Sequence, residues 1–134
     1  MKSQITKLTL ILLMFSGFLS RAQQFTNYTI DNGLPDNNVN GVAIDTNNHK
    51  WFGTSAGVAM FNDTTWKVYT TADGLIDNSV NCIAVDKNNN IWAGTDAGLS
   101  KFNGTTWTSY TTDSGLIYSM VSYIAAAPDG SIWI

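Results

Sequence analysis

One fixed interval relates three segments of this chain to one another. The spacing from Gly33 to Gly74 equals the spacing from Gly74 to Gly115, and each glycine is followed by a leucine. A period of about 41 residues with strand-like content is typical of a β-propeller with one blade per repeat. We therefore predict an all-β chain built from four-stranded blades. The same interval relates Val39 to Val80 and Val121, Trp51 to Trp92 and Trp133, Gly53 to Gly94, and Gly57 to Gly98.

The second repeat predicts four strands, over residues 80–85, 91–95, 99–102 and 107–111. The first of them, VNCIAV, is apolar nearly throughout, which is typical of a strand buried on both faces and here predicts the innermost strand of a blade. Asn48, Asn89 and Gly130 share one position in the first turn of each repeat. Asparagine and glycine best tolerate positive φ, so we expect a hairpin with a left-handed residue there.

The register divides the chain into two whole blades, 32–72 and 73–113, and a truncated blade, 114–134. Extended backwards, it matches Tyr28 with Tyr69 and Tyr110 and predicts a lone outer strand over 23–31. Such a strand commonly completes the blade formed by the other terminus and closes the ring. Because a propeller has about four blades or more, we expect an incomplete propeller whose partners include further C-terminal blades of the same protein.

Residues 1–22 have the layout of a secretory signal peptide. Lys2 and Lys7 precede an apolar run, Leu8 to Leu19, and Ser20-Arg21-Ala22 forms a small-x-small cleavage site. The run is shorter than the roughly 20 residues that span a bilayer. We expect cleavage after Ala22 and an exported bacterial protein that is periplasmic, on the cell surface or secreted.

The mature chain is acidic. Beyond residue 22 it has four lysines against ten aspartates, a net charge of −6, and no glutamate. Aspartate favours tight turns because its side chain bonds nearby backbone N–H groups. No basic patch is present, so we predict no nucleic-acid partner and no membrane contact by the mature chain.

Catalytic and metal sites lack the necessary parts. His49 is the only histidine, so a histidine-dependent triad or metal site is incomplete. Asp86-x-Asn88-x-Asn90 resembles the start of a calcium loop, but the glycine at its sixth position and the acid at its twelfth are missing. We therefore predict no enzyme activity, no catalytic residues, no cofactor and no metal.

The repeat resembles the two-component regulator propeller family. The residues that carry the resemblance are Gly74-Leu75, Ile83 to Asp86, Ile91 to Thr95 and Ala97-Gly98-Leu99, and the first repeat matches at corresponding positions, whereas the third departs. The resemblance implies an extracytoplasmic sensor or recognition module. Many such propellers precede a transmembrane segment and a histidine kinase and sense glycan fragments. Others occur in secreted or surface proteins without a kinase.

Our leading hypothesis is accordingly the recognition module of a two-component sensor or of a secreted surface protein. Two alternatives stay open. One is the N-terminal part of a propeller lyase or hydrolase whose catalytic residues lie in further blades, and the other is a structural scaffold in adhesion.

The candidate ligand site lies where loops meet at one end of the ring. In a propeller, the loop from a fourth strand to the next first strand shares a face with the loop between strands two and three. The predicted contacts at the channel mouth are Asp36, Asn37, Asp77, Asn78, Asp96 and Tyr118. Amides, carboxylates and one aromatic ring suit a polar small ligand or a glycan. The alternative is that Asp36 and Asp77 only cap their turns.

The tryptophans and glycines of the repeat are predicted to be structural. Trp51, Trp92 and Trp133 recur in the second strand, where blades pack face to face, so packing is favoured over sugar stacking. The glycines that we expect to be structural for the same reason are Gly53, Gly94, Gly57 and Gly98.

Overall fold

Two four-stranded antiparallel sheets dominate the computed structural model, which describes residues 25–134. The predicted signal peptide, residues 1–22, lies outside the described residues. In each sheet the strands follow one another in chain order, as in a propeller blade. The first sheet contains β1 (Val39–Ile44), β2 (Lys50–Thr54), β3 (Gly57–Phe61) and β4 (Trp66–Tyr69), and the second contains β5 (Val80–Val85), β6 (Ile91–Thr95), β7 (Leu99–Phe102) and β8 (Trp107–Tyr110).

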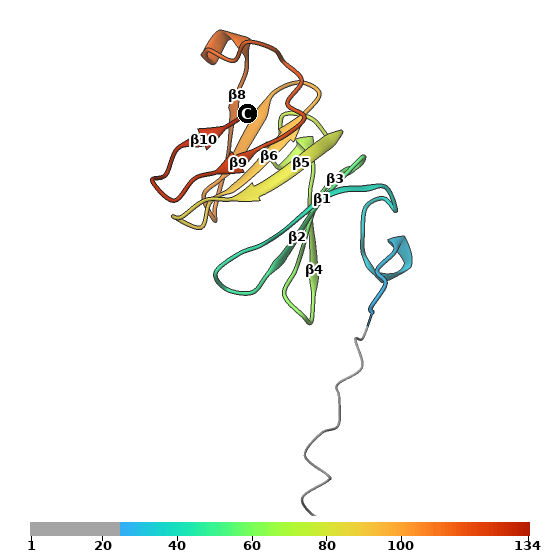
Figure 1. Cartoon of the computed structure of the whole chain (residues 1–134). Helices are drawn as coiled ribbons and strands as arrows, with labels where there is room; N and C mark the ends of the chain where they lie inside the picture. The colour runs from blue at the N-terminus through green and yellow to red at the C-terminus, as the bar shows by residue number, and fades with distance from the viewer. Residues whose placement is uncertain (1–24) are drawn as a thin grey trace, which may run out of the picture.

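A short hairpin and three 3-10 turns complete the described part of the chain. The hairpin pairs β9 (Ala125–Ala126) with β10 (Ile132–Trp133) and belongs to the third repeat. The 3-10 turns are η1 (Ile30–Asn32), η2 (Thr71–Asp73) and η3 (Thr112–Ser114). β5 contacts both β1 and β9, so the first strands of the three repeats lie next to one another, as Figure 1 shows. Within residues 25–134 no helix is long and apolar enough to cross a membrane.

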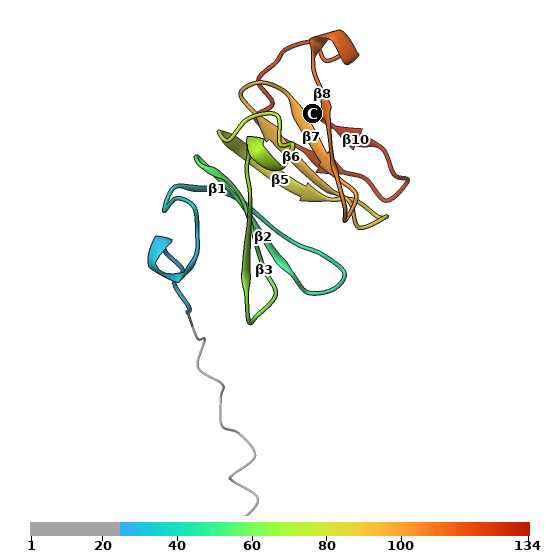
Figure 2. The same ribbon diagram turned by 180° about the vertical axis from the view of Figure 1, so that it is seen from behind.

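The predicted repeat is confirmed in its strands and in its turns. Figure 2 shows the two sheets from behind as separate blades, and strands begin at equivalent repeat positions in β1 and β5, β2 and β6, and β4 and β8. The shared turn residue has positive φ in all three repeats, 65° at Asn48, 64° at Asn89 and 97° at Gly130. This is the left-handed region that asparagine and glycine tolerate best.

Gly53 and Gly94 provide the space in which the next repeat packs. A Cβ at Gly53 would lie 2.7 Å from Cγ1 of Val80, and a Cβ at Gly94 would lie 2.7 Å from Cγ1 of Val121. Neither distance is compatible with ordinary packing. Val80 and Val121, which occupy equivalent positions, therefore each fit against a glycine in the second strand of the preceding repeat, which explains why the valine and the glycine recur at the same interval.

Gly53→Ala is expected to destabilise the protein by about 2 kcal/mol, because an added methyl group overpacks a filled contact. Val80→Ala removes the methyl group that the new Cβ would meet. The double variant is therefore expected to lose less unfolding free energy than the two single variants lose in sum. Chemical denaturation of the parent, the two single variants and the double variant measures this coupling. Strictly additive losses would contradict the proposed contact.

The main core lies between the two sheets. Trp51, which is 4% exposed, stacks on Tyr69 with ring centroids 5.7 Å apart and contacts Phe102 of the next blade at 5.8 Å. The remaining buried members are Val58, Leu75, Val80, Ile83, Ile91 and Ala93. Both blades contribute to this cluster, so the two sheets are stabilised largely by the apolar surface that they bury against each other.

Two expectations about burial need correction. Trp51 is buried as predicted, but Trp92 is half-buried and Trp133 is 68% exposed. Trp51 packs against Phe102 of the following repeat, whereas no further repeat follows Trp133 among the described residues. The first strand of the first repeat is not buried on both faces, because no repeat precedes it among the described residues: Val42 is 58% exposed, whereas its equivalent, Ile83, is 9% exposed between two repeats.

The start of the described chain also differs from the prediction of a lone outer strand over 23–31. Residues 25–29 pair with no strand among the described residues, and η1 begins at Ile30. Tyr28 nevertheless packs on Phe61 at 5.2 Å and on Trp66 at 5.4 Å. Its equivalent in the next repeat, Tyr69, contacts the matching Phe102 and Trp107 at 5.0 and 5.7 Å. The side-chain packing of the repeat therefore extends back to Tyr28, although the backbone of residues 25–29 forms no strand. Ring closure by this segment stays a prediction.

Candidate functional site

The structure brings the predicted mouth loops together at one end of the blades. Asn38 Nδ2 donates to Ser55 Oγ at 2.8 Å, and Ser55 N donates to Asn38 O at 3.2 Å. In the second repeat Asp96 N donates to Ser79 O at 3.3 Å. The connection that precedes a first strand therefore contacts the turn between the second and third strands in both blades, and we call this end of the molecule the mouth.

Four of the predicted mouth residues use a side-chain oxygen in local turns. Asp36 Oδ1 accepts from Asn38 N at 2.7 Å, and Asp77 Oδ1 accepts from Ser79 N at 3.0 Å. The neighbouring asparagines reach further back: Asn37 Oδ1 accepts from Ile30 N and Asn78 Oδ1 from Thr71 N, both at 2.9 Å. These bonds fix the loops on the 3-10 turns before them, so part of each side chain has a structural role.

Two residues that sequence reasoning missed lie in β-bulges at the mouth. The register of the β1–β2 pair shifts between Val39 and Gly41, which places Asn40 in a bulge, and the β5–β6 pair shifts in the same way at Asn81. Bulges often re-aim a side chain near a functional site. The available signal was that Asn40 and Asn81 are asparagines at one register position within otherwise apolar strands.

The hydrogen bonds of these asparagines fix the orientation of both amide groups. Asn40 Nδ2 donates to Val80 O of the next blade at 2.8 Å, and a carbonyl oxygen can only accept. Asn81 Nδ2 donates to the carboxylate of Asp96 at 2.9 Å and to Val121 O at 3.4 Å, which are also pure acceptors. Each Oδ1 is therefore turned away from the contact between blades, and no donor within residues 25–134 bonds to it.

Asp96 lies at the mouth as predicted. Its side chain is exposed and belongs to the turn after β6. Hydrogen bonds from Asn81 and Ser79 hold the pKa of the Asp96 carboxyl below its usual value. The group is thus an oriented carboxylate at neutral pH.

The third repeat presents an apolar surface where the first two present amides and carboxylates. Tyr118 is 77% exposed and stands where the other repeats have Asp36 and Asp77. With Met120 and Tyr123 it lines an open hollow of about 490 Å³. The mouth is therefore polar along the first two blades and aromatic along the third.

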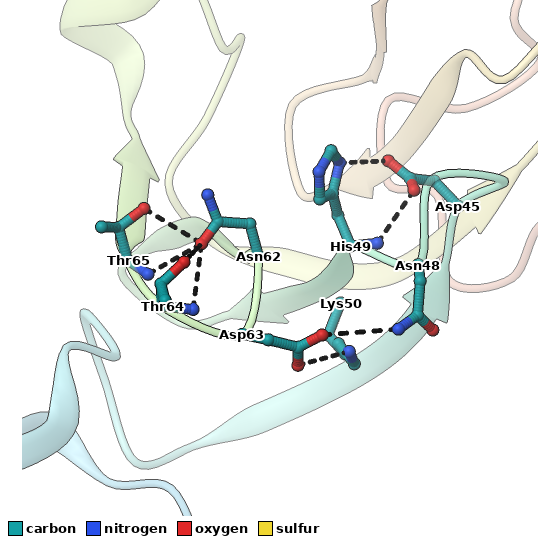
Figure 3. Close-up of polar contacts among 8 residues, drawn as sticks. All are labelled: Asp45, Asn48, His49, Lys50, Asn62, Asp63, Thr64 and Thr65. Atoms are coloured by element: carbon teal, nitrogen blue, oxygen red, sulfur yellow. Dashed lines mark hydrogen bonds and ion pairs between the residues drawn. The ribbon is translucent and has the colours of Figure 1, made fainter.

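At the opposite end, Asp45 joins the β1–β2 turn to Trp51. Its carboxylate is buried; Oδ1 accepts from Asn47 N at 2.8 Å and His49 N at 3.0 Å, and Oδ2 lies 2.9 Å from His49 Nδ1 and accepts from Trp51 Nε1 at 3.0 Å. Figure 3 shows the bonds to His49. Burial raises the pKa of the Asp45 carboxyl, but the bonds from Trp51, His49 and Asn47 outweigh it, so the pKa is lowered.

Asp86 repeats this arrangement in the second blade. Its carboxylate accepts from Asn88 N at 2.9 Å, from Asn90 N at 2.9 Å and from Trp92 Nε1 at 2.9 Å. The segment that resembles the start of a calcium loop thus uses its aspartate to hold a hairpin turn and a tryptophan. Within residues 25–134 no group of three or more His, Cys, Asp or Glu side chains is arranged to hold a metal ion.

The comparisons with known proteins agree with this architecture. The model of a family described as "Two component regulator propeller" matches residues 74–97. The chain carries a two-component regulator propeller repeat. The matched segment begins at the end of the η2 turn and includes Asn81, Asp86, Trp92 and Asp96. In this two-component regulator propeller repeat, the bulge asparagine and the bonded Asp–Trp pair therefore lie at opposite ends of one blade.

Among solved structures, the chain is similar to the extracellular domain of a hybrid two-component system protein from B. thetaiotaomicron. The TM-score is 0.72 at 24% sequence identity, and the match covers 84% of this chain. This likeness shows the β-propeller fold. The match spans 16% of the neighbour's own chain. A search of curated proteins finds no match.

Proposed function

We propose that this chain is the recognition part of an exported sensor propeller and that its mouth binds a polar ligand of the glycan type. The observation that carries the proposal is the pair of bulge asparagines, Asn40 and Asn81. Both amides are fixed by bonds to the next repeat, and both leave an acceptor oxygen without a partner among the described residues. Preoriented acceptors, together with the exposed ring of Tyr118 in the third repeat, suit a ligand with many hydroxyl donors.

Two further findings support a sensor. The two-component regulator propeller repeat covers residues 74–97, and a solved structure of the same fold is the extracellular domain of a hybrid two-component system protein. An extracytoplasmic location also agrees with the signal-peptide layout of residues 1–22.

The arrangement suggests how a bound ligand changes the spacing between adjacent blades. Asn40 joins a mouth side chain to the backbone of the next repeat at Val80, and Asn81 does the same at Val121. A ligand that bonds to both Oδ1 atoms bridges adjacent blades and favours one spacing between them. Such a ligand therefore stabilises the conformation to which it binds better, which is the requirement for signalling.

The first test uses Tyr118→Ala in the full-length exported protein. Tyr118 is 77% exposed and makes no hydrogen bond within residues 25–134, so its truncation is expected to leave the melting temperature unchanged. Calorimetric titration with cello-, xylo-, malto- and galacto-oligosaccharides is expected to show binding that the variant weakens about tenfold, the loss of roughly 1.4 kcal/mol of stacking.

Phe25→Ala is the matched control, because Phe25 is also an exposed aromatic residue, at 83%, outside the mouth. It is expected to leave the affinity unchanged. If a sugar binds and the Tyr118→Ala variant binds it as tightly as the parent protein does, Tyr118 does not contact the ligand. Failure of every oligosaccharide to bind contradicts the glycan class itself.

A further inference from the structure

Three Asn-Gly steps occur in the chain: Asn32-Gly33, Asn40-Gly41 and Asn103-Gly104. In such a step the backbone nitrogen of the glycine can attack the side-chain carbonyl carbon of the asparagine, because glycine has no Cβ to hinder the approach. This chemistry is one reason why asparagine is thermolabile in proteins. The structure holds the three steps in different ways.

A hydrogen bond on the attacking nitrogen and close packing of the backbone oppose the reaction at Asn32-Gly33. The attacking nitrogen, Gly33 N, donates to Ile30 O at 3.2 Å at the end of η1. A Cβ at Gly33 would also lie 2.6 Å from the ring of Trp66, so this backbone is closely packed. Attack requires these contacts to break first.

The Asn40-Gly41 step is held within a sheet. Gly41 lies in β1 opposite Gly53. The leaving group of the reaction, Asn40 Nδ2, donates to Val80 O at 2.8 Å across the contact between blades. Rotation of this amide toward the Gly41 nitrogen would break the bond between the two blades.

The Asn103-Gly104 step is open by comparison. It lies in the exposed turn between β7 and β8, and a Cβ at Gly104 would meet no atom within 4 Å. Gly104 N and Asn103 Nδ2 donate to no acceptor within residues 25–134. Both the attacking and the leaving nitrogen are therefore free of hydrogen bonds to the described chain.

The same turn activates the carbonyl that is attacked. Asn103 Oδ1 accepts from Thr105 N and from Thr106 N, each at 2.9 Å. Negative charge develops on this oxygen when a nucleophile adds to the carbon. Fixed N–H donors at that oxygen stabilise the charge, as in an oxyanion hole.

From this geometry we propose that Asn103 is a site of spontaneous deamidation. The Gly104 N–H loses its proton to a base in the solvent, and its nitrogen adds to Cγ of Asn103. The intermediate expels Nδ2, which leaves as ammonia after taking up a proton from water, and a succinimide forms. Water then opens the ring to aspartate or isoaspartate, so that overall one water is consumed and one ammonia is released. No oxidant, metal or enzyme is needed.

The first blade contains a matched comparison. Asn62 Oδ1 accepts from Thr64 N at 3.1 Å and from Thr65 N at 2.7 Å, as Figure 3 shows, in the turn equivalent to that of Asn103. The next residue is Asp63 instead of glycine, and Lys50 Nζ holds its carboxylate at 2.6 Å. Asn62 therefore has the activated carbonyl without the accessible nitrogen.

The experiment follows deamidation of the folded full chain in mildly alkaline buffer by peptide mass spectrometry. Asn103 is expected to convert well ahead of Asn32, Asn40 and Asn62. In denaturant the three Asn-Gly steps are expected to deamidate at similar rates. Asn62 is expected to deamidate more slowly than these three, because Asp63 and not glycine follows it. A folded protein in which Asn32 or Asn40 converts as fast as Asn103 overturns the proposal.

A second variant tests the attacking nitrogen itself. Gly104→Asp copies the first-blade turn, where Asp63 already adopts a φ of 73°. It is expected to slow conversion at Asn103 by about tenfold, the effect of a modestly higher barrier. Unchanged conversion in this variant, with the fold retained by circular dichroism, shows that Gly104 N is not the nucleophile and also overturns the proposal.

Discussion

Trp51→Ala is expected to lower the free energy of unfolding by about 3–5 kcal/mol, the usual loss when a buried tryptophan is truncated. Trp51 is 4% exposed and its ring contacts Tyr69 in its own blade and Phe102 in the next. The substitution therefore removes packing within one sheet and between two sheets at once. It also leaves the buried carboxylate of Asp45 without the Trp51 Nε1 donor. Chemical denaturation of the variant and its parent measures the loss.

The three equivalent tryptophans provide an internal series of controls. Trp92 is half-buried and stacks on Tyr110 at 5.9 Å, whereas Trp133 is 68% exposed and bonds only to Ser131 Oγ, at 3.0 Å. In the described chain, alanine at the three positions is thus expected to cost progressively less from Trp51 to Trp92 to Trp133. Equal losses at all three positions would mean that the packing between repeats does not determine their contribution.

The strands were predictable because packing between repeats constrains the same positions each time. Val80 must meet Gly53, and Val121 must meet Gly94, so the interval between equivalent positions is preserved without a gap. The burial of individual strands was not predictable from one repeat alone. Val42 and Ile83 occupy equivalent positions but differ in exposure, because only Ile83 lies between two described neighbours.

The mouth was predictable in its location but not in its contacts. Propeller topology alone placed Asp36 and Asp77 beside the turns that contain Ser55 and Asp96. The bonds of Asn37 and Asn78 run to backbone nitrogens seven residues earlier and exist only because a 3-10 turn presents those nitrogens. The recurring asparagines Asn40 and Asn81 mark one register position, but the sequence does not show that they lie in bulges, because an extra residue in one strand is recognised only against its partner.

The bond between aspartate and tryptophan was also missed, although its signal repeats. Asp45 precedes Trp51 by six residues, and Asp86 precedes Trp92 by the same interval. In the second repeat, Asp86-x-Asn88-x-Asn90 resembles the start of a calcium loop, because the first, third and fifth positions of such a loop carry the same residue types. The segment is instead a hairpin turn, because the tryptophan indole folds back onto the aspartate that starts the turn and donates a hydrogen bond to it.

Asp45→Asn is expected to destabilise the protein by roughly 3 kcal/mol, because bonds to a buried carboxylate are strong and a lost acceptor leaves donors unpaired. The amide has one acceptor oxygen, so its NH₂ group must face either the two turn nitrogens or the His49 and Trp51 side chains. Asp36→Asn is the matched control. The Asp36 side chain accepts a turn bond from Asn38 N, which an asparagine oxygen also accepts, so its loss is expected to stay within about 0.5 kcal/mol.

The pH dependence of the Asp45→Asn loss identifies its cause. The pKa of Asp45 is lowered by folding, so its ionised carboxylate stabilises the protein above the unfolded-state pKa of about 3.9. This contribution disappears as the pH falls through that value toward the lower pKa of the folded state. The difference in unfolding free energy between parent and variant should therefore shrink in acid. Asp86 titrates in both proteins and its effect cancels in the difference. A difference that is constant from neutral pH into acid would assign the loss to packing and not to the carboxylate charge.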